Sequence, residues 1–154
     1  MARSFARQKP QEGEMPAPGA GQLKALIQAA AAARLMAYAP YSKFHVGAAV
    51  LDDQGRVHAG CNVENAAYPQ GQCAEAGALA AMVLAGSTGA RALVVCGDGR
   101  APCMPCGGCR QRLREFAPPT LPVIIADAAG KVLARHTLGE LLPASFGPGH
   151  LDKA

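Results

Sequence analysis

The chain has 154 residues, half of them hydrophobic, and its 15 lysines and arginines stand against 11 aspartates and glutamates. This length suits one domain with a sizeable core and is short for two. The net charge of +4 is mild and no basic block is concentrated near the N-terminus, so charge gives little support to a nucleic-acid-binding class.

The N-terminal residues differ in composition from the rest of the chain. Residues 1–19 are rich in Pro, Gly and polar side chains, which predicts a flexible tail followed by a single domain over residues 20–154. The tail has no apolar core of the signal-peptide kind. The most apolar segment, residues 23–39, is interrupted by Lys24, Gln28 and Arg34 and is therefore not a membrane span. We expect a cytoplasmic protein with no membrane or nucleic-acid partner.

The first half of the chain predicts two helices and three strands. From Gln22 onwards apolar residues recur at helical spacing, which indicates a helix that Pro40 stops. Residues 46–51 and 56–63 flank the turn sequence DDQG and predict a β-hairpin. Residues 73–86 are rich in Ala and lack Pro, which indicates a second helix ending near Gly86. Residues 92–97 predict a short buried strand.

The second half continues the alternation of helices and strands. Residues 106–116 predict a helix that Pro118 and Pro119 stop. Residues 121–127 and 131–136 flank another turn and indicate two further strands. Thr137, followed by Glu140, resembles a capping box that opens a last short helix. This order of elements predicts an α/β fold with helices layered on a sheet.

Three closely spaced cysteines form two overlapping C-x-x-C pairs in PCMPCGGC, residues 102–109. Cys106 and Cys109 stand at the predicted start of a helix, where both sulfurs can face one point. A helix start favours thiolate over thiol, because unpaired N–H groups and the positive end of the helix dipole lie there. Cys103 lies between two prolines, on a segment that we do not expect to be helical.

The start of the preceding helix carries Cys73 and Glu75. Two residues along a helix correspond to a rotation of about 200°, so these side chains converge only if Cys73 lies at the helix entry. Three thiolates leave a tetrahedral zinc ion one position for water, as in catalytic zinc sites. A carboxylate beside the metal that is not a ligand is what proton transfer needs.

Two other interpretations of these cysteines stay open at this point. A C-x-x-C pair alone is more often a structural zinc site or a redox pair. In a closed structural site Cys103 is the obvious fourth sulfur. A redox role for Cys103 and Cys106 leaves Cys73 and Glu75 unexplained. C-A-E before one helix with P-C-x-x-C before the next is more specific, and it matches the three-cysteine form of the zinc deaminase signature.

Four segments together resemble the small cytidine deaminases, of the homotetrameric type with three cysteine zinc ligands. They are APYSKFHVGAAV (39–50), GCNVENAAYPQGQCAE (60–75), PCGGCRQ (105–111) and ELLPASFGP (140–148), in the family's order. The resemblance covers roughly residues 23–148. It implies a three-layer α/β/α sandwich around a mixed five-stranded sheet.

The resemblance also implies a reaction: hydrolytic deamination of cytidine and deoxycytidine to uridine and deoxyuridine, in pyrimidine salvage. It assigns one zinc ion per subunit to Cys73, Cys106 and Cys109. Glu75 would shuttle protons while a zinc-bound hydroxide attacks C4 of the ring. The implied substrate contacts, of which the last reaches a neighbouring subunit's site, are Phe44, Asn62, Glu64, Tyr68 and Phe146.

One position departs from the family pattern. Many three-cysteine members carry Arg directly after C-A-E, where it offsets the charge of the third thiolate, but this chain has Ala76. We expect the two helix starts to offset part of that charge, with a contribution from Arg110. The alternative functions are deamination of another aminopyrimidine nucleoside such as blasticidin S, or a non-catalytic zinc-stabilised module.

Overall fold

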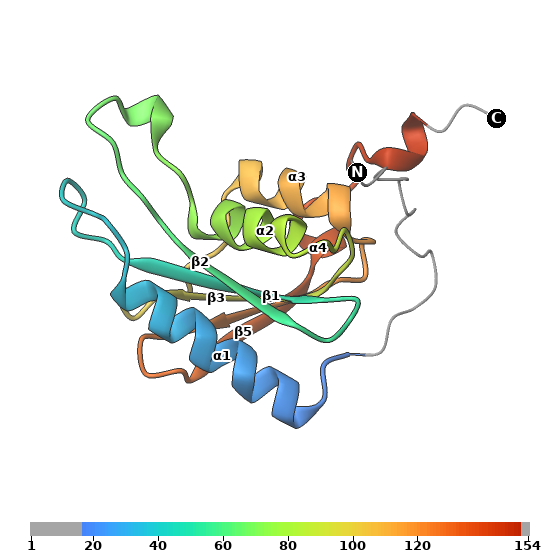
Figure 1. Ribbon diagram of the computed structural model, residues 1–154, viewed down its shortest axis with the longest axis horizontal. Helices are drawn as coiled ribbons and strands as arrows, with labels where there is room; N and C mark the ends of the chain where they lie inside the picture. The colour runs from blue at the N-terminus through green and yellow to red at the C-terminus, as the bar shows by residue number, and fades with distance from the viewer. Residues whose placement is uncertain (1–16, 152–154) are drawn as a thin grey trace.

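The computed structural model describes residues 17–151 and contains one mixed five-stranded sheet (Figure 1). The strands lie in the order β2-β1-β3-β4-β5; β3 and β4 are parallel and the other neighbours are antiparallel. The strand bounds are β1 Val46–Asp52, β2 Val57–Cys61, β3 Ala90–Gly97, β4 Pro122–Ala126 and β5 Val132–Thr137. All five predicted strands are therefore present. The tail predicted for residues 1–19 lies almost wholly outside the described residues.

Helices cover both faces of this sheet. Helix α1 (Ala20–Leu35) lies on one face, while α2 (Ala74–Leu84), α3 (Gly107–Phe116) and the short α4 (Leu138–Leu141) lie on the other (Figure 1). Two single 3-10 turns, Tyr68–Gln70 and Pro148–His150, complete the described chain. The three-layer α/β/α arrangement implied by the family resemblance is confirmed. None of the helices in residues 17–151 is both long and apolar enough to span a bilayer.

The central strands contribute side chains to two separate hydrophobic cores, because successive side chains point to opposite faces of the sheet. Val50 and Leu93 lie in the core beneath α2 and α3. Leu51 and Val94, each one residue further along, lie in the core beneath α1. All four are fully buried. The sheet is covered on both faces, and this fixes where the helix starts lie relative to the strand ends.

The predicted hairpin forms around a buried carboxylate. Gly55 adopts a φ of +81° in its turn, a conformation that favours glycine. Asp52 is fully buried and accepts hydrogen bonds from Arg56 Nε at 2.7 Å and His58 Nε2 at 2.8 Å. Burial raises the pKa of Asp52, but these hydrogen bonds outweigh burial and the net pKa is lowered. The carboxylate thus holds β1 and β2 together at their turn.

The end of α1 differs from the sequence prediction. The helix ends at Leu35, before Pro40, and Met36 caps it by donating its N–H to Ala33 O at 3.0 Å. The chain then pairs Tyr38 with Val63 in an isolated parallel bridge, and this pairing requires extended backbone. Pairing with the segment after β2, and not proline, therefore ends the helix.

Two glycines allow the helices to approach the sheet closely. A Cβ atom on Gly47 of β1 would lie 2.9 Å from Arg34 Cα on α1. A Cβ atom on Gly60 of β2 would lie 2.6 Å from the carbonyl oxygen of Ala74 and 2.7 Å from the carbonyl carbon of Gly77, both on α2. Only residues without a Cβ fit these contacts.

Candidate metal centre

Two of the three predicted ligands are the N-cap residues of helices that pack side by side. Cys73 caps α2 with φ −74° and ψ 153°, and Cys106 caps α3 with φ −65° and ψ 165°. Cys109 follows within the first turn of α3. The prediction that Cys73 lies at the helix entry is confirmed. Because a cap residue is extended, its side chain points back over the helix start instead of following the helical rotation.

The three sulfurs lie together in the geometry of a zinc site. All three are within 4.8 Å of one another, and Cys73 Sγ lies 3.8 Å from Cys106 Sγ. Two sulfurs at a Zn–S distance of about 2.3 Å and a tetrahedral angle stand about 3.8 Å apart. All six cysteines of the chain are free. The donor set therefore fits one zinc ion, with a fourth position left for a non-protein ligand.

The pKa values of the three thiols shift in different directions. Burial raises the pKa of Cys106, but the nearby backbone N–H and side chain of Cys109 outweigh it, so the net pKa of Cys106 is lowered. Burial raises the pKa values of Cys73 and Cys109. In the metal-free chain Cys106 is accordingly the first of the three thiols to ionise as the pH rises.

Glu75 lies beside the three sulfurs and is almost fully buried, with 4% of its surface exposed. It lines one pocket together with Asn62, Cys73, Cys103 and Cys106. Burial raises the pKa of Glu75, while hydrogen bonds from its own backbone N–H and from the Cys109 side chain, and after them the positive charge of Arg112, oppose that rise. A buried carboxyl group with a raised pKa suits a residue that has to accept and return a proton near neutral pH.

Cys103 lies next to this site but outside the sulfur cluster. Among the described residues, the group of side chains close enough to share a metal ion contains Cys73, Cys106 and Cys109 and not Cys103. Cys103 instead packs against Gly97, where an added Cβ would lie 2.9 Å from its Sγ. Burial raises the pKa of Cys103 to about 11. This arrangement disfavours the closed four-sulfur site.

Asn62 and Glu64 stand after β2, and their side chains already bind backbone. The Asn62 amide accepts from Val46 N at 2.8 Å and donates to Phe44 O at 2.9 Å. The Glu64 carboxylate accepts from Tyr41 N at 2.9 Å and from Ser42 N at 3.2 Å, and it also accepts from the Ser42 hydroxyl. Both side chains therefore hold the segment 41–46 at the edge of the pocket.

The three aromatic candidates are all exposed, and none of them lines the Glu75 pocket. Phe44, 41% exposed, precedes β1, and its ring tip would lie 3.6 Å from a Cβ on Gly97. Tyr68 stands in a separate hollow beside Tyr41, with the two rings edge to face at 5.8 Å. Phe146 stacks on His150 at 4.9 Å and is 56% exposed. The structure thus brings together the three candidate zinc ligands and Glu75, whereas these aromatic side chains lie outside that pocket and are exposed to solvent.

Two arginines of α3 lie near the site. Arg110 donates from Nε to Pro105 O and from Nη1 to Leu141 O, both at 2.7 Å. It fastens the cysteine loop to the end of α4. Arg112 was not singled out from the sequence, and it is the arginine whose positive charge opposes the rise in the pKa of Glu75. Its only sequence signal is that it is one of three arginines in α3, with Arg110 and Arg114.

Comparison with known proteins places this site in a family. Residues 21–125 match the family model described as the cytidine and deoxycytidylate deaminase zinc-binding region. A cytidine deaminase from Sporosarcina psychrophila is 41% identical over 129 residues, covering 84% of this chain and 94% of that protein.

Solved structures agree with the sequence relatives. The crystal structure of cytidine deaminase from Burkholderia pseudomallei has a TM-score of 0.74 and 46% identity, covering 80% of this chain and 98% of its own. That from Mycobacterium tuberculosis has a TM-score of 0.70 and 40% identity, covering 81% and 97%. The matched region contains the three clustered cysteines and Glu75. The chain therefore belongs to the cytidine and deoxycytidylate deaminase family and carries that family's zinc-binding region.

Proposed function

We propose that this chain is a zinc-dependent cytidine deaminase that converts cytidine and deoxycytidine to uridine and deoxyuridine with release of ammonia. The observation that carries the proposal is the juxtaposition of three free thiols within 4.8 Å of one another and the buried Glu75 in an adjoining pocket. A closed structural zinc site involves no proton transfer and therefore does not require a buried carboxyl group beside the metal.

The residues of the site divide into metal ligands and a proton carrier. Cys73, Cys106 and Cys109 hold the zinc ion, which when bound acts as a Lewis acid and lowers the pKa of water. Glu75 accepts a proton from the attacking water. It delivers this proton to N3 of the pyrimidine as the water oxygen bonds to C4. Glu75 then moves the second proton of that water from the C4 hydroxyl to the amino group, so that the C4–N bond breaks, ammonia leaves and the ring becomes that of uridine.

The remaining candidates are proposed substrate contacts. Asn62 and Glu64 lie at the mouth of the pocket, where polar side chains can grip the ribose hydroxyls. Phe44 offers an apolar surface beside the nucleoside, and Tyr68 borders the hollow next to Glu64.

We further propose that the enzyme is a homotetramer whose sites are completed by neighbouring subunits. Phe146 is exposed and does not line the pocket of its own chain, yet its carbonyl accepts a hydrogen bond from Gln111 on α3 at 2.9 Å. An exposed aromatic ring held in place in this way is suited to cover the base in an adjacent subunit. Such an enzyme serves pyrimidine salvage in the cytoplasm as a single domain over residues 20–154.

The decisive experiment is ultraviolet-monitored turnover of cytidine by the purified, zinc-replete protein, with deoxycytidine and blasticidin S assayed in parallel. Conversion of cytidine and deoxycytidine supports the proposal. Turnover of blasticidin S alone would assign the chain to another aminopyrimidine nucleoside. A protein that binds zinc tightly and turns over none of the three would be a non-catalytic zinc-stabilised module.

A further inference from the structure

A zinc ion with three thiolates carries a formal charge of minus one. This excess negative charge weakens zinc binding, because each thiol has to lose its proton near the others, and it opposes the Lewis acidity of the metal. The helix starts at Cys73 and Cys106 supply only partial positive charges. Ala76, directly after Glu75, supplies none. A full positive charge from elsewhere in the chain would balance the site.

Arg110 keeps its positive charge, because its guanidinium donates only to neutral backbone oxygens, and it contributes to the balance from the side of the cysteine loop. Its Nε and Nη1 atoms donate to the carbonyls of Pro105 and Leu141. These contacts direct it towards the cysteine loop backbone and the end of α4. Arg110 is therefore a structural tie between two segments.

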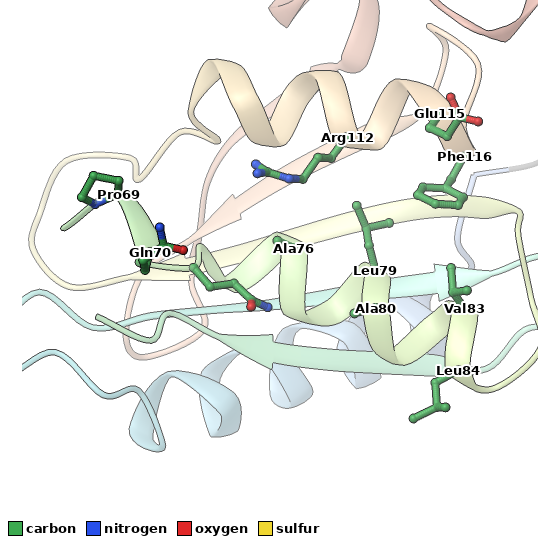
Figure 2. A pocket seen from close by; sticks show the side chains of 12 residues that line it. Pro69, Gln70, Ala76, Leu79, Ala80, Val83, Leu84, Arg112, Glu115 and Phe116 are labelled. Carbon is green, nitrogen blue, oxygen red and sulfur yellow. The ribbon is translucent and has the colours of Figure 1, made fainter. Parts of the chain in front are cut away.

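Arg112, two residues further on, points the other way. It lines the groove between α2 and α3 together with Ala76. Figure 2 shows its guanidinium directed along this groove, above Ala76 at the start of α2. The short side chain of Ala76 leaves that space open.

The distance from this guanidinium to the sulfur cluster is short. A Cβ atom built on Gly108 would lie 3.1 Å from Arg112 Nη1 and 4.0 Å from Cys106 Sγ. Because both distances start from the same point, the nitrogen and the sulfur cannot be more than about 7 Å apart. At that range a unit charge acts strongly on a thiolate, even with partial solvent screening.

No acidic side chain in the described part of the chain forms an ion pair with this guanidinium. Within residues 17–151 Arg112 makes no hydrogen bond or ion pair, whereas Arg34 and Arg56 each pair with an aspartate. Glu115 lines the same groove, but its carboxylate lies at the opposite end of it (Figure 2). The positive charge of Arg112 therefore faces the metal site, where it also acts on the Glu75 carboxyl and opposes the rise of its pKa.

We propose that Arg112 supplies the positive charge that balances the third thiolate of the zinc site, in the space left by Ala76. The proposal rests on the zinc chemistry of the proposed function. Arg112 touches neither substrate nor ligand atoms in this role, and acts through the field it exerts on the thiolates.

The test measures zinc affinity without substrate, by competition with a chromogenic chelator. Arg112→Gln should weaken zinc binding about tenfold or more, from the loss of one charge about 7 Å away. Arg112→Lys should stay within about threefold of the parent. Arg135→Gln, on the edge strand β5, is the matched control and should leave the affinity unchanged. An affinity for Arg112→Gln within twofold of the parent would overturn the proposal.

A second variant separates charge from structure. Arg112→Gln combined with Ala76→Arg should recover most of the lost zinc affinity, because the new guanidinium enters the same groove. Failure of this rescue, together with a changed subunit count by light scattering, would make Arg112 a subunit contact instead and overturn the charge role. Thermal unfolding of the metal-free variants checks folding; Arg112 is exposed, so Arg112→Gln should match the parent.

The outcomes also separate this proposal from the proposed function. If zinc binding responds as expected while no variant deaminates cytidine, the catalytic function fails and the role of Arg112 stands.

Discussion

Replacing Gly60 with alanine should loosen the fold and the zinc site together. The new methyl group would lie 2.6 Å from the Ala74 carbonyl oxygen and 2.7 Å from the Gly77 carbonyl carbon. Both atoms are backbone of α2 and cannot turn aside as a side chain can. The nearest atom, Ala78 N, would lie only 2.4 Å from the methyl group, so restoring a contact of about 3.4 Å requires α2 to move away from β2 by about 1 Å.

That movement sets the expected magnitudes. Overpacking of this kind destabilises a core by about 1–3 kcal/mol. Cys73 caps α2, so it moves with the helix, whereas Cys106 belongs to α3 and stays. Metal–ligand distances tolerate about 0.2 Å, so a displacement of this size should weaken zinc binding at least about tenfold.

Urea unfolding of the metal-free protein and chelator competition for zinc measure the two effects separately. Gly21→Ala is the control, because nothing lies within 4 Å of its added methyl group; on α1 it should leave stability unchanged or raise it by about 0.5–1 kcal/mol. An alanine at Gly60 that unfolds at the parent's urea midpoint and keeps the parent's zinc affinity would refute the close-contact reasoning.

Three further variants test the rest of the site and fold. Glu75→Gln should keep the zinc content of the parent while kcat falls by about 10² to 10⁴, the usual range for loss of a general acid–base; metal analysis with steady-state kinetics measures both, and an active variant contradicts the proton role. Cys103→Ser should bind one zinc per chain as the parent does; loss of zinc on dialysis would restore the four-sulfur alternative. The lowered pKa of Asp52 means that its contribution to stability is present above its ordinary value of 3.8 and is lost as the pH falls through the folded value. Asp52→Asn should therefore lower stability at pH 7 and flatten the urea midpoint between about pH 5 and pH 2, and an unchanged acid dependence would count against the buried carboxylate.

The elements that carry strong local signals could be predicted from the sequence. The turn sequence DDQG and the alternating residues around it indicate β1 and β2, and the capping box of Thr137 and Glu140 is present at α4. The zinc cluster was predictable for a similar reason. Only a residue at a helix entry lets Cys73 face the same point as Glu75, and that constraint follows from helical geometry.

Other features depend on how the elements pack. Arg110 and Arg112 differ by about 200° around α3, and only the docked helix decides which of them faces the sulfurs. The use of Asn62 to bind the backbone of Phe44 and Val46 follows from a long-range contact that no spacing encodes. The end of α1 at Leu35 likewise depends on pairing between Tyr38 and Val63.

The side chains of Asn62 and Glu64 have a consequence for how a ligand meets the protein. Their hydrogen bonds to the backbone of residues 41–46 order that segment while the chain folds. Fixing the backbone of one residue opposes association by about 1–2 kcal/mol when the ligand has to bring it about. Here the segment is already ordered in the folded protein, so ligand binding does not have to order it. The affinity of the enzyme therefore reflects contacts with the ligand. A rim that is rigid beforehand also selects by shape, because it does not readjust around a ligand that fits poorly.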